Sequence, residues 1–325
     1  MKKVIYCFVA SVLLAGLFLG CTSAPPETIE LKAMSAFPQT VVYTEPLNIL
    51  MEEFNKRAAG KAVMNWVGGP EAIPAFEQLD PLGEGVFDIL YSSAGYHEGK
   101  IGEISSFRII PRPSAAEERK IGYYDYMNSK FQERNVYFLG RADDMGYVFY
   151  TTKPVPTLAD FKGLRIRSSA TYVALLKALG AEQIVIALPE TFSALERGLV
   201  DGLGLPDLGV IDYGFVDAVK YYIVHPYMVT DGALFMNLDT WNGLPKDLQK
   251  LLTDIVIEIE TDMPNRHRRL LAKEEAGLRE AGVEFIEFSP AEEQQYLKMA
   301  NESAWARVKE VAPQSYDKIR QLLGQ

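Results

Sequence analysis

Arg167 is the residue of this sequence best suited to bind an anion, because of where it stands. It ends a short, largely apolar stretch that starts at Leu164, and Ser168 and Ser169 follow it directly. This order predicts a strand that ends in an arginine, next to two hydroxyl groups and the start of a helix. A guanidinium donates two parallel hydrogen bonds to a carboxylate, and the free N–H groups of a helix N-terminus also favour anions. We therefore predict that Arg167 and Ser169 bind an anionic group; a structural ion pair is the alternative for Arg167.

The elements that must position Arg167 lie between Pro154 and Pro206. The pattern predicts strands at 164–167 and 184–186, helices at 170–179 and 190–198, and a third strand from Asp201. Gly180 is typical of the residue that ends a helix. Strands that alternate with helices build a parallel sheet, and ligands bind at the carboxyl ends of its strands. The sequence thus predicts an α/β fold with Arg167 at the ligand-binding edge.

The same region carries an ordered set of motifs. It reads D-F-K-G-L-R-I-R at 160–167, then A-L-G-A at 178–181 and P-E-T-F-S-A-L-E-R-G-L-V-D-G at 189–202. This run resembles the signature region of the TRAP-transporter solute-binding proteins, the DctP-like family, and weaker similarity extends from Ile29 to the C-terminus. The resemblance implies a two-lobed α/β fold, periplasmic-binding-protein type II-like, with crossing strands and a long helix that spans both lobes. It also implies an extracytoplasmic receptor that binds a small organic acid between the lobes and delivers it to a TRAP-type membrane permease.

Two positions depart from what the resemblance implies for the site. In the family an arginine at the position of Arg167 clamps the ligand carboxylate. Many members support it with an asparagine where this chain has Leu205, and with a second arginine near the position of Val148. Both changes make the pocket more apolar. We therefore expect a carboxylate ligand with an apolar or aromatic body.

Further candidates for ligand binding follow other predicted strands or flank the same sheet. They are Phe37, Glu71, Ser92, Ser93, Tyr96, Tyr147, Tyr172, Leu205, Pro206, Asp207 and Tyr213. Glu71 is predicted at a helix start, where it either complements the helix dipole or faces the cleft. One of Ser92 and Ser93 is expected to cap the next helix instead of binding ligand. The aromatic residues and Leu205 form either the cleft wall or the core.

The amino terminus predicts export. Lys2 and Lys3 precede an apolar run that reaches Leu19, which is the pattern of a signal peptide over residues 1–20. Phe18-Leu19-Gly20-Cys21 resembles a lipobox, so we expect lipidation of Cys21 and a tether over 21–28; plain secretion is the alternative. This chain is then periplasmic and meets the membrane only through a lipid anchor.

The remaining pattern divides the chain between two lobes. Lobe I is expected to comprise 29–145 and 233–272, and lobe II 146–232 and 273–325. We expect one helix over 115–134, a turn at Asp143-Asp144, a long helix over 246–281 kinked at Pro264, and a solvated basic run at 266–269.

The composition and the missing motifs exclude several classes. A net charge of −10 argues against a nucleic-acid partner. The 3 histidines are scattered, and the sequence has no P-loop, no G-x-S-x-G and no H-E-x-x-H, so we predict no enzyme activity, no cofactor and no metal site. A hydrolase that uses Ser92 or Ser93 lacks a base at plausible spacing. A ligand-sensing protein for a membrane signalling partner remains the alternative function, since its binding domain would look the same.

Overall fold

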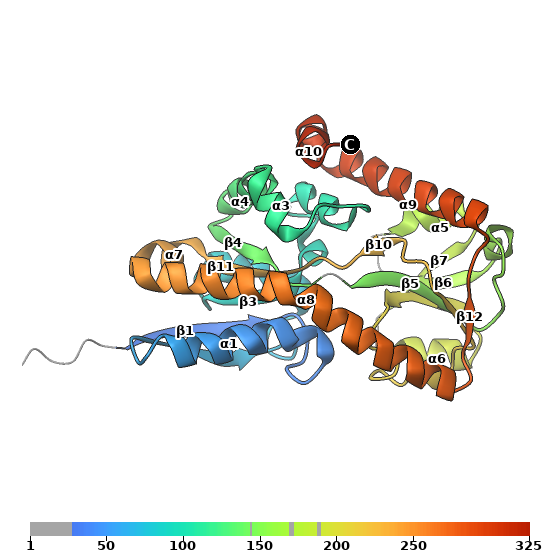
Figure 1. Cartoon of the computed structure of the whole chain (residues 1–325), viewed down its shortest axis with the longest axis horizontal. Coiled ribbons are helices and arrows are strands. Elements are labelled where there is room, and N and C mark those ends of the chain that lie inside the picture. Colours follow the sequence, from blue (N-terminus) through green and yellow to red (C-terminus); the bar gives the residue numbers. More distant parts are fainter. Residues whose placement is uncertain (1–27, 144, 169–171, 187–189) are drawn as a thin grey trace, which may run out of the picture.

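Two β-sheets lie side by side in the computed structural model, which describes residues 28–143, 145–168, 172–186 and 190–325 (Figure 1). Lobe I is the part of the chain around the five-stranded sheet, whose order is β2-β1-β3-β11-β4. Lobe II is the part around the second sheet, ordered β12-β9-β5-β8-β6-β7, with β10 paired to β5. The two-lobed α/β architecture expected from the sequence is confirmed.

In lobe I, β1 runs parallel to β2 and β3, and β11 is antiparallel to β3 and β4. The strands are β1 (Ile29–Ser35), β2 (Ala62–Gly68), β3 (Ile89–Ser93), β4 (Val136–Arg141) and β11 (Gly232–Asn237). The α-helices are α1 (Glu45–Arg57), α2 (Leu79–Gly83), α3 (Ala115–Lys120), α4 (Tyr123–Gln132) and α7 (Leu238–Gly243). Short 3-10 turns follow the strands: η1 (Val42–Thr44), η2 (Ala75–Glu77), η3 (Ala94–His97) and η4 (Gly102–Arg108). These turns and the ends of β1, β2 and β3 that precede them lie on the side of lobe I that faces lobe II.

In lobe II, β6 is parallel to both β7 and β8, which confirms the predicted alternation around Arg167. The strands are β5 (Gly146–Thr151), β6 (Arg165–Ser168), β7 (Glu182–Val185), β8 (Gly202–Pro206), β9 (Tyr221–Ile223), β10 (Met228–Val229) and β12 (Glu284–Ile286). The helical elements are η5 (Leu158–Phe161), α5 (Val173–Ala178), α6 (Thr191–Glu196) and η8 (Phe215–Asp217). Strand β5 is antiparallel to β8, β9 and β10, so the sheet is mixed, and buried apolar clusters cover both of its faces.

The chain crosses between the lobes where β4 leads to β5 and where β10 leads to β11. Helix α8 (Lys246–Glu280) runs along both lobes, and Figure 1 shows its two halves at an angle to each other. Pro264 stands inside α8, and a proline kinks a helix because it lacks an N–H group and its ring clashes with the preceding turn. The long spanning helix is therefore confirmed.

Helix α9 (Pro290–Val311) is a second bridge, which the sequence did not indicate. Tyr296 packs in a core cluster of lobe II, whereas Trp305 and Val308 pack in a core cluster of lobe I. Helix α10 (Tyr316–Leu323) also packs on lobe I through Ile319. All of 273–325 was expected in lobe II, but the apolar residues of these last helices bury the C-terminal part of this range against lobe I.

Three local expectations are wrong. Gly122, at φ 79°, separates α3 from α4, so no single helix covers 115–134. Residues after Gly69 form turns before η2, so Glu71 does not start a helix. Asp143 is not in a turn but is buried and bonded on several sides in the segment that crosses to lobe II; Asp144 lies outside the described residues. Over the part of the chain that the structure describes, no helix has both the length and the apolarity of a membrane span.

Candidate functional site

Arg167 lies at the carboxyl end of β6, as predicted, and its residue is only 9% exposed. Its Nε donates to the carbonyl of Ile186 at 3.1 Å. Two other arginines of the described residues are as deeply buried, and each has a carboxylate: Arg108 pairs with Asp231 at 2.7 Å and Arg141 with Glu118 at 3.0 Å. Among the residues that the structure describes, no carboxylate pairs with Arg167. A buried cation without a counter-charge is costly, so this guanidinium is available for an anionic ligand.

Two buried tyrosines from opposite lobes are within electrostatic range of this guanidinium. Burial, helped by the charge of Asp231, raises the pKa of Tyr96 in lobe I to about 12, and Arg167 and Arg108 act against that rise. Burial also raises the pKa of Tyr147 in lobe II well above its ordinary value, again against the effect of both arginines. Both phenols are therefore protonated donors within electrostatic reach of two guanidinium groups.

An aromatic band joins the two lobes beside these tyrosines. The Phe37 ring lies 6.0 Å from that of Tyr96 and 5.6 Å from that of Tyr43, all in lobe I. Tyr43 in turn stacks on Tyr213 of lobe II at 6.1 Å and donates its hydroxyl to the carbonyl of Leu208 at 2.7 Å. Of the predicted wall residues, Phe37, Tyr96 and Tyr213 are thus brought together. Tyr43 was missed, because it falls at a helix start and no local pattern marks a ring that reaches the other lobe.

Tyr172 lies against the backbone that carries Arg167. Its hydroxyl is 3.4 Å from the carbonyl of Arg167 and 3.2 Å from that of Gly204. Its ring lies 6.0 Å from the ring of Tyr147. Tyr172 and Tyr147 therefore form one aromatic wall on the α5 side of the lobe II sheet, while Leu205 is buried in the core on the other face.

Several predicted polar residues are already bonded within the protein. Ser92 is fully buried, and its hydroxyl bonds to the carbonyl of Ser93 and to His97, each at 3.1 Å. Ser93 donates to Asp231 at 2.6 Å and makes no side-chain cap of η3, so neither serine caps a helix. Glu71 is exposed and accepts from the N–H of Gly69 at 2.7 Å. These groups lie around the cleft without pointing free donors at Arg167.

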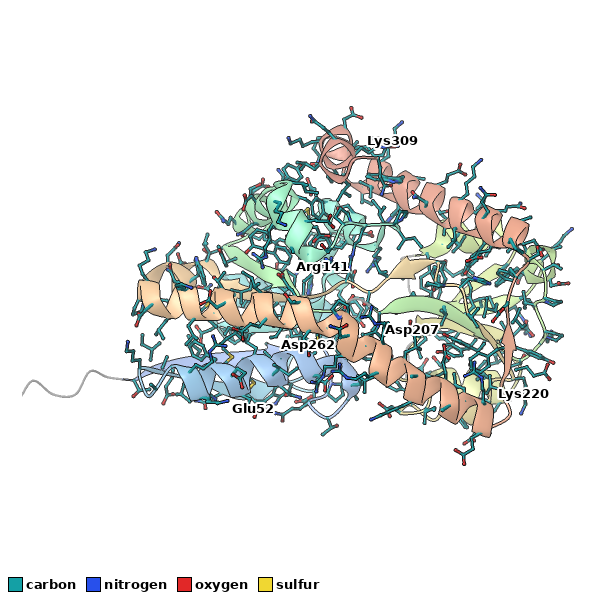
Figure 2. All side chains as sticks on the ribbon, in the orientation of Figure 1. Glu52, Arg141, Asp207, Lys220, Asp262 and Lys309 are labelled. Carbon is teal, nitrogen blue, oxygen red and sulfur yellow. The ribbon has the colours of Figure 1, made fainter. Side chains whose placement is uncertain are left out.

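Asp207 joins helix α8 to the start of β5, where the chain crosses between the lobes and which we call the hinge. One carboxylate oxygen lies 2.8 Å from Nε2 of His267 on α8, and the other accepts from the N–H of Gly146 at 3.2 Å. Figure 2 shows Asp207 beside α8, where the lobes meet. Burial raises the pKa of Asp207, and the contact with His267 lowers it. His267 therefore faces inward, and its neighbour Arg266 pairs with Glu45. The expectation of a solvated basic run is wrong for these two residues and holds for Arg268 and Arg269, which are exposed.

A second buried acid stands on the other crossing segment. Asp231 accepts from Arg108 at 2.7 Å, from the Ser93 hydroxyl at 2.6 Å and from the N–H of Gly95 at 2.9 Å. Close by, Asp143 accepts from Tyr91 and from the N–H of Gly232, each at 3.1 Å. The two acids fix the crossing segments to the end of β3. Sequence reasoning missed Asp231 and Arg108, because nothing near either residue in the chain indicates its distant partner.

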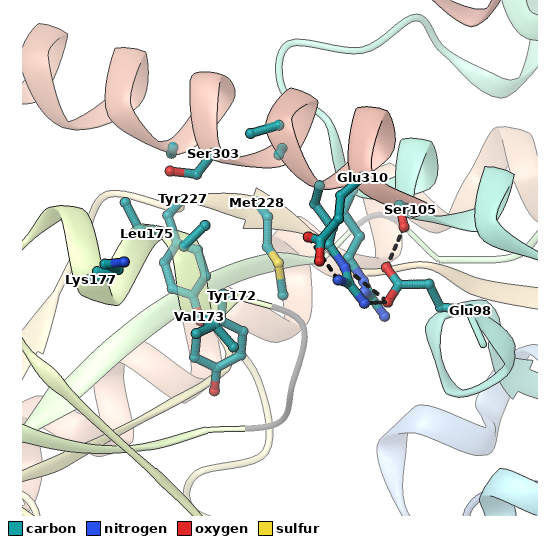
Figure 3. Close-up of a pocket in the computed structure, with 16 residues that line it drawn as sticks. Glu98, Ser105, Tyr172, Val173, Leu175, Lys177, Tyr227, Met228, Ser303 and Glu310 are labelled. Atoms are coloured by element: carbon teal, nitrogen blue, oxygen red, sulfur yellow. Dashed lines mark hydrogen bonds and ion pairs between the residues drawn. The ribbon is translucent and has the colours of Figure 1, made fainter. Parts of the chain in front are cut away.

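A cavity of about 370 Å³ lies beneath α9, between the lobes (Figure 3). Lobe I lines it with Glu98, Ser105 and Arg108, lobe II with residues that include Tyr172, Val173, Tyr227 and Met228, and α9 with residues that include Ser303 and Arg307. Arg307 is bonded to Glu98 at 2.6 Å and to Glu310 at 3.0 Å. Most of the remaining wall is apolar. The cavity shares the side chain of Tyr172 with the surroundings of Arg167.

Two of the predicted site residues, Ser169 and Cys21, lie outside the described residues. Pro206 is buried at the end of β8, next to Asp207. Within the described ranges, no group of histidine, cysteine, aspartate and glutamate side chains is arranged to hold a metal ion.

This chain matches its curated relatives over only part of their length. It is 28% identical over 198 residues to the C4-dicarboxylate-binding periplasmic protein DctP of Rhodobacter capsulatus, covering 60% of this chain and 56% of that protein. It is 23% identical over 232 residues to a monocarboxylate 2-oxoacid-binding periplasmic protein of Nostoc, covering 67% and 63%. A 34% match to an uncharacterized protein of Haemophilus influenzae covers 31% and 32%. The chain thus spans about a third to three fifths of the length of these relatives.

Solved structures match over nearly the whole chain. A TRAP periplasmic solute-binding protein from Desulfovibrio salexigens with bound orotic acid has a TM-score of 0.81 at 18% identity, covering 91% of this chain and 98% of that one. The apo open structure of a TRAP periplasmic solute-binding protein from Marinobacter aquaeolei has a TM-score of 0.80 at 16% identity, covering 91% and 100%. At these identities the matches show the fold.

The sequence also matches a family of known proteins over residues 33–310, which includes both lobes, the Arg167 region and most of α9. The chain therefore belongs to the DctP family, the bacterial extracellular solute-binding proteins of family 7, and is a solute-binding protein of the TRAP-transporter type.

Proposed function

We propose that this protein binds a small monocarboxylate with an apolar or aromatic body between its lobes and delivers it to the membrane subunits of a TRAP permease. The observation that carries the proposal is Arg167: a deeply buried guanidinium that no carboxylate of the described residues neutralises. A planar guanidinium fixes both the charge and the orientation of a carboxylate. Tyr96 and Tyr147 supply further hydroxyl groups and apolar ring surface around it.

One free positive charge favours one carboxylate. Strand β8, next to β6, offers Leu205, and β5, the strand beyond it, offers Val148 instead of polar groups; both side chains are buried. The relatives include proteins named for dicarboxylates and for monocarboxylate 2-oxoacids, so the family accommodates both kinds. Among the deeply buried arginines of the described residues, Arg167 alone has no carboxylate partner, which supports the second kind for this chain.

Lobe closure supplies the rest of the binding energy. The hydrogen bond from Tyr43 to Leu208 and the stacking of Tyr43 on Tyr213 join the lobes beside the site. A ligand that contacts both lobes stabilises this closed arrangement, since it favours the state in which it makes more contacts. The same movement would serve a membrane signalling partner, which stays the second candidate because the binding domain would be identical.

Export and anchoring complete the proposal. Residues 1–20 act as a signal peptide, and lipid on Cys21 tethers the receptor through 21–28 in the periplasm. The basic start, apolar run and Gly20-Cys21 pair of the sequence support this.

A thermal-shift experiment tests the ligand class. A ligand that binds only the native state raises the melting temperature by mass action. Monocarboxylates with aliphatic or aromatic bodies are expected to raise it in the parent protein and not in Arg167→Ala. If only neutral sugars or polyamines raise it, the proposal is wrong.

A further inference from the structure

We infer that Arg108 is a second ligand-binding arginine of the cleft, and that Asp231 restricts it to a neutral oxygen of the ligand. The preferred ligand is then a monocarboxylate that carries a carbonyl or hydroxyl group some distance from its carboxylate. The inference rests on the proposed function, because it assumes that Arg167 takes the carboxylate.

Arg108 is held in a site built for it. It ends η4, its side chain is 9% exposed, and one Nη lies 2.7 Å from a carboxylate oxygen of Asp231. A Cβ on Gly95 would fall 1.2 Å from that nitrogen, so the guanidinium lies directly against the backbone of Gly95. Only glycine leaves this space open. A side chain at position 95 would occupy the place of the arginine.

Arg108 reaches the cavity between the lobes from lobe I, the lobe opposite to that of Arg167. It lines the cavity beneath α9 together with Tyr172, whose hydroxyl contacts the carbonyl of Arg167 at 3.4 Å. Both arginines also act electrostatically on Tyr96 and Tyr147. A ligand held by Arg167 can thus extend toward Arg108.

The carboxylate of Asp231 neutralises the charge of Arg108 but leaves some of its N–H groups free to donate. A guanidinium has five N–H donors, and among the described residues its partner is this one carboxylate. Ser93 and the N–H of Gly95 complete the shell of Asp231, which keeps the carboxylate in place. A ligand oxygen can accept from the remaining N–H groups. A second ligand carboxylate would gain from Arg108 but would be repelled by Asp231 at similar range.

The other cations of the cavity do not change this balance. Arg307 is bonded to both Glu98 and Glu310. Lys177 is exposed at the rim, where water and salt screen its charge. The apolar residues Val173 and Met228 suit the body of the ligand. Charge recognition is therefore left to Arg167, and Arg108 recognises a neutral acceptor.

Three acids with the same five-carbon chain test this division. Pentanoate ends in a methyl group, 4-oxopentanoate carries a neutral carbonyl, and glutarate has a second carboxylate. Calorimetric titration of the parent protein should give tightest binding for 4-oxopentanoate and weakest for glutarate. Arg108→Met should remove the advantage of 4-oxopentanoate over pentanoate, about tenfold for one hydrogen bond to a charged group, while pentanoate changes little.

Asp231→Asn is the decisive variant, because it exposes the charge of Arg108 and keeps one acceptor oxygen for the N–H of Gly95, while its amide NH2 can donate to the Ser93 hydroxyl. It should improve glutarate relative to pentanoate by at least about tenfold. Asp247→Asn removes an exposed carboxylate that pairs with Lys61 at 2.6 Å in lobe I, far from the cleft, and should leave the ratio unchanged. If Asp231→Asn does not fold, as judged by circular dichroism, the Arg108→Met/Asp231→Asn double variant removes both charges and should lose the preference for 4-oxopentanoate.

The outcomes separate this inference from the proposed function. If Arg167→Ala abolishes binding but the glutarate ratio of Asp231→Asn matches that of the parent, the role of Arg108 is refuted alone. If Asp231→Asn shifts the ratio while Arg167→Ala binds normally, Arg108 recognition stands and the Arg167 assignment falls. If the parent binds none of the three acids, the inference about Arg108 is refuted, and the thermal-shift panel alone decides the proposed function. A double variant that still prefers 4-oxopentanoate also contradicts the inference.

Discussion

Tyr43 of lobe I donates its hydroxyl to the carbonyl of Leu208 in lobe II at 2.7 Å, and both residues are buried. This bond joins the segment after β1 to the segment after β8, beside the proposed site. We expect opening of the lobes to break it, which would assign it to the closed state. The ligand and this bond therefore favour the same arrangement.

Tyr43→Phe should weaken ligand binding about three- to tenfold, because one neutral hydrogen bond of the closed state is worth about 0.5–1.5 kcal/mol. Calorimetric titration with the tightest-binding acid measures this. Tyr124→Phe is the matched control, since its hydroxyl also donates at 2.7 Å, to Phe138 within lobe I. That change should lower the melting temperature without changing affinity. Equal affinity losses in the two variants would show that Tyr43 has no special role in closure.

His97 should make the fold sensitive to mild acid. Burial, with the charge of Lys100, lowers the pKa of this histidine from 6.5 to about 4. The unfolded chain therefore takes up a proton between pH 6.5 and 4 that the folded chain refuses, so stability falls as pH falls through this window. The full loss is on the order of 3 kcal/mol.

Urea unfolding of the parent and of His97→Gln at pH 7 and pH 5 measures this effect. Glutamine is neutral throughout and can keep a hydrogen bond with Ser92, which lies 3.1 Å from the histidine ring. The parent should lose more stability than the variant between the two pH values. An identical loss of stability in both proteins would show that His97 does not cause the sensitivity to acid.

Cys21→Ser should release the protein from the membrane fraction, because serine cannot form the thioether that anchors a lipoprotein. Detergent partitioning of cell fractions measures the change, with the parent as reference. Retention of the variant in the detergent phase would contradict the predicted lipid anchor and the tether over 21–28.

The elements of lobe II were predictable where their signals are local. Short apolar runs bounded by glycines, such as the run after Gly180, predict these elements. The observed limits of β6, α5, β7, α6 and β8 lie within a few residues of the predicted ones. The helical pattern of α8 was equally clear. The break at Gly122 was not, because the charged helical pattern continues on both sides of it.

The site was predictable only in part, for a physical reason. Arg167 has a local signal, namely its place at a strand end before two serines. Arg108 acquires its role from Asp231 and Gly95, which reach it only through the fold. Asp207 has the position of a ligand-binding residue in the sequence, yet His267 on α8 takes up its carboxylate. Pairings of this kind depend on tertiary packing and leave no trace in local residue patterns.

The central claim is that the unpaired guanidinium of Arg167 binds the ligand carboxylate. Removing one partner of a buried charge pair costs about 3–5 kcal/mol, because the other charge stays buried alone. At about 1.4 kcal/mol per tenfold change, Arg167→Ala should weaken binding by roughly two to three orders of magnitude. Arg167→Lys keeps the charge without the planar fork and should also bind clearly worse than the parent.

Arg165→Ala is the internal control for that measurement. Arg165 is two residues earlier on β6, at the other end of the strand, where it pairs with Asp201 at 3.0 Å and its side chain is 38% exposed. Calorimetric titration of the folded variants should show that Arg165→Ala binds the ligand about as tightly as the parent. Arg167→Ala should bind it roughly hundreds of times more weakly, as a loss of about 3–5 kcal/mol implies. Binding by Arg167→Ala within about threefold of the parent, or a larger loss in Arg165→Ala, would contradict the assignment of the anion site.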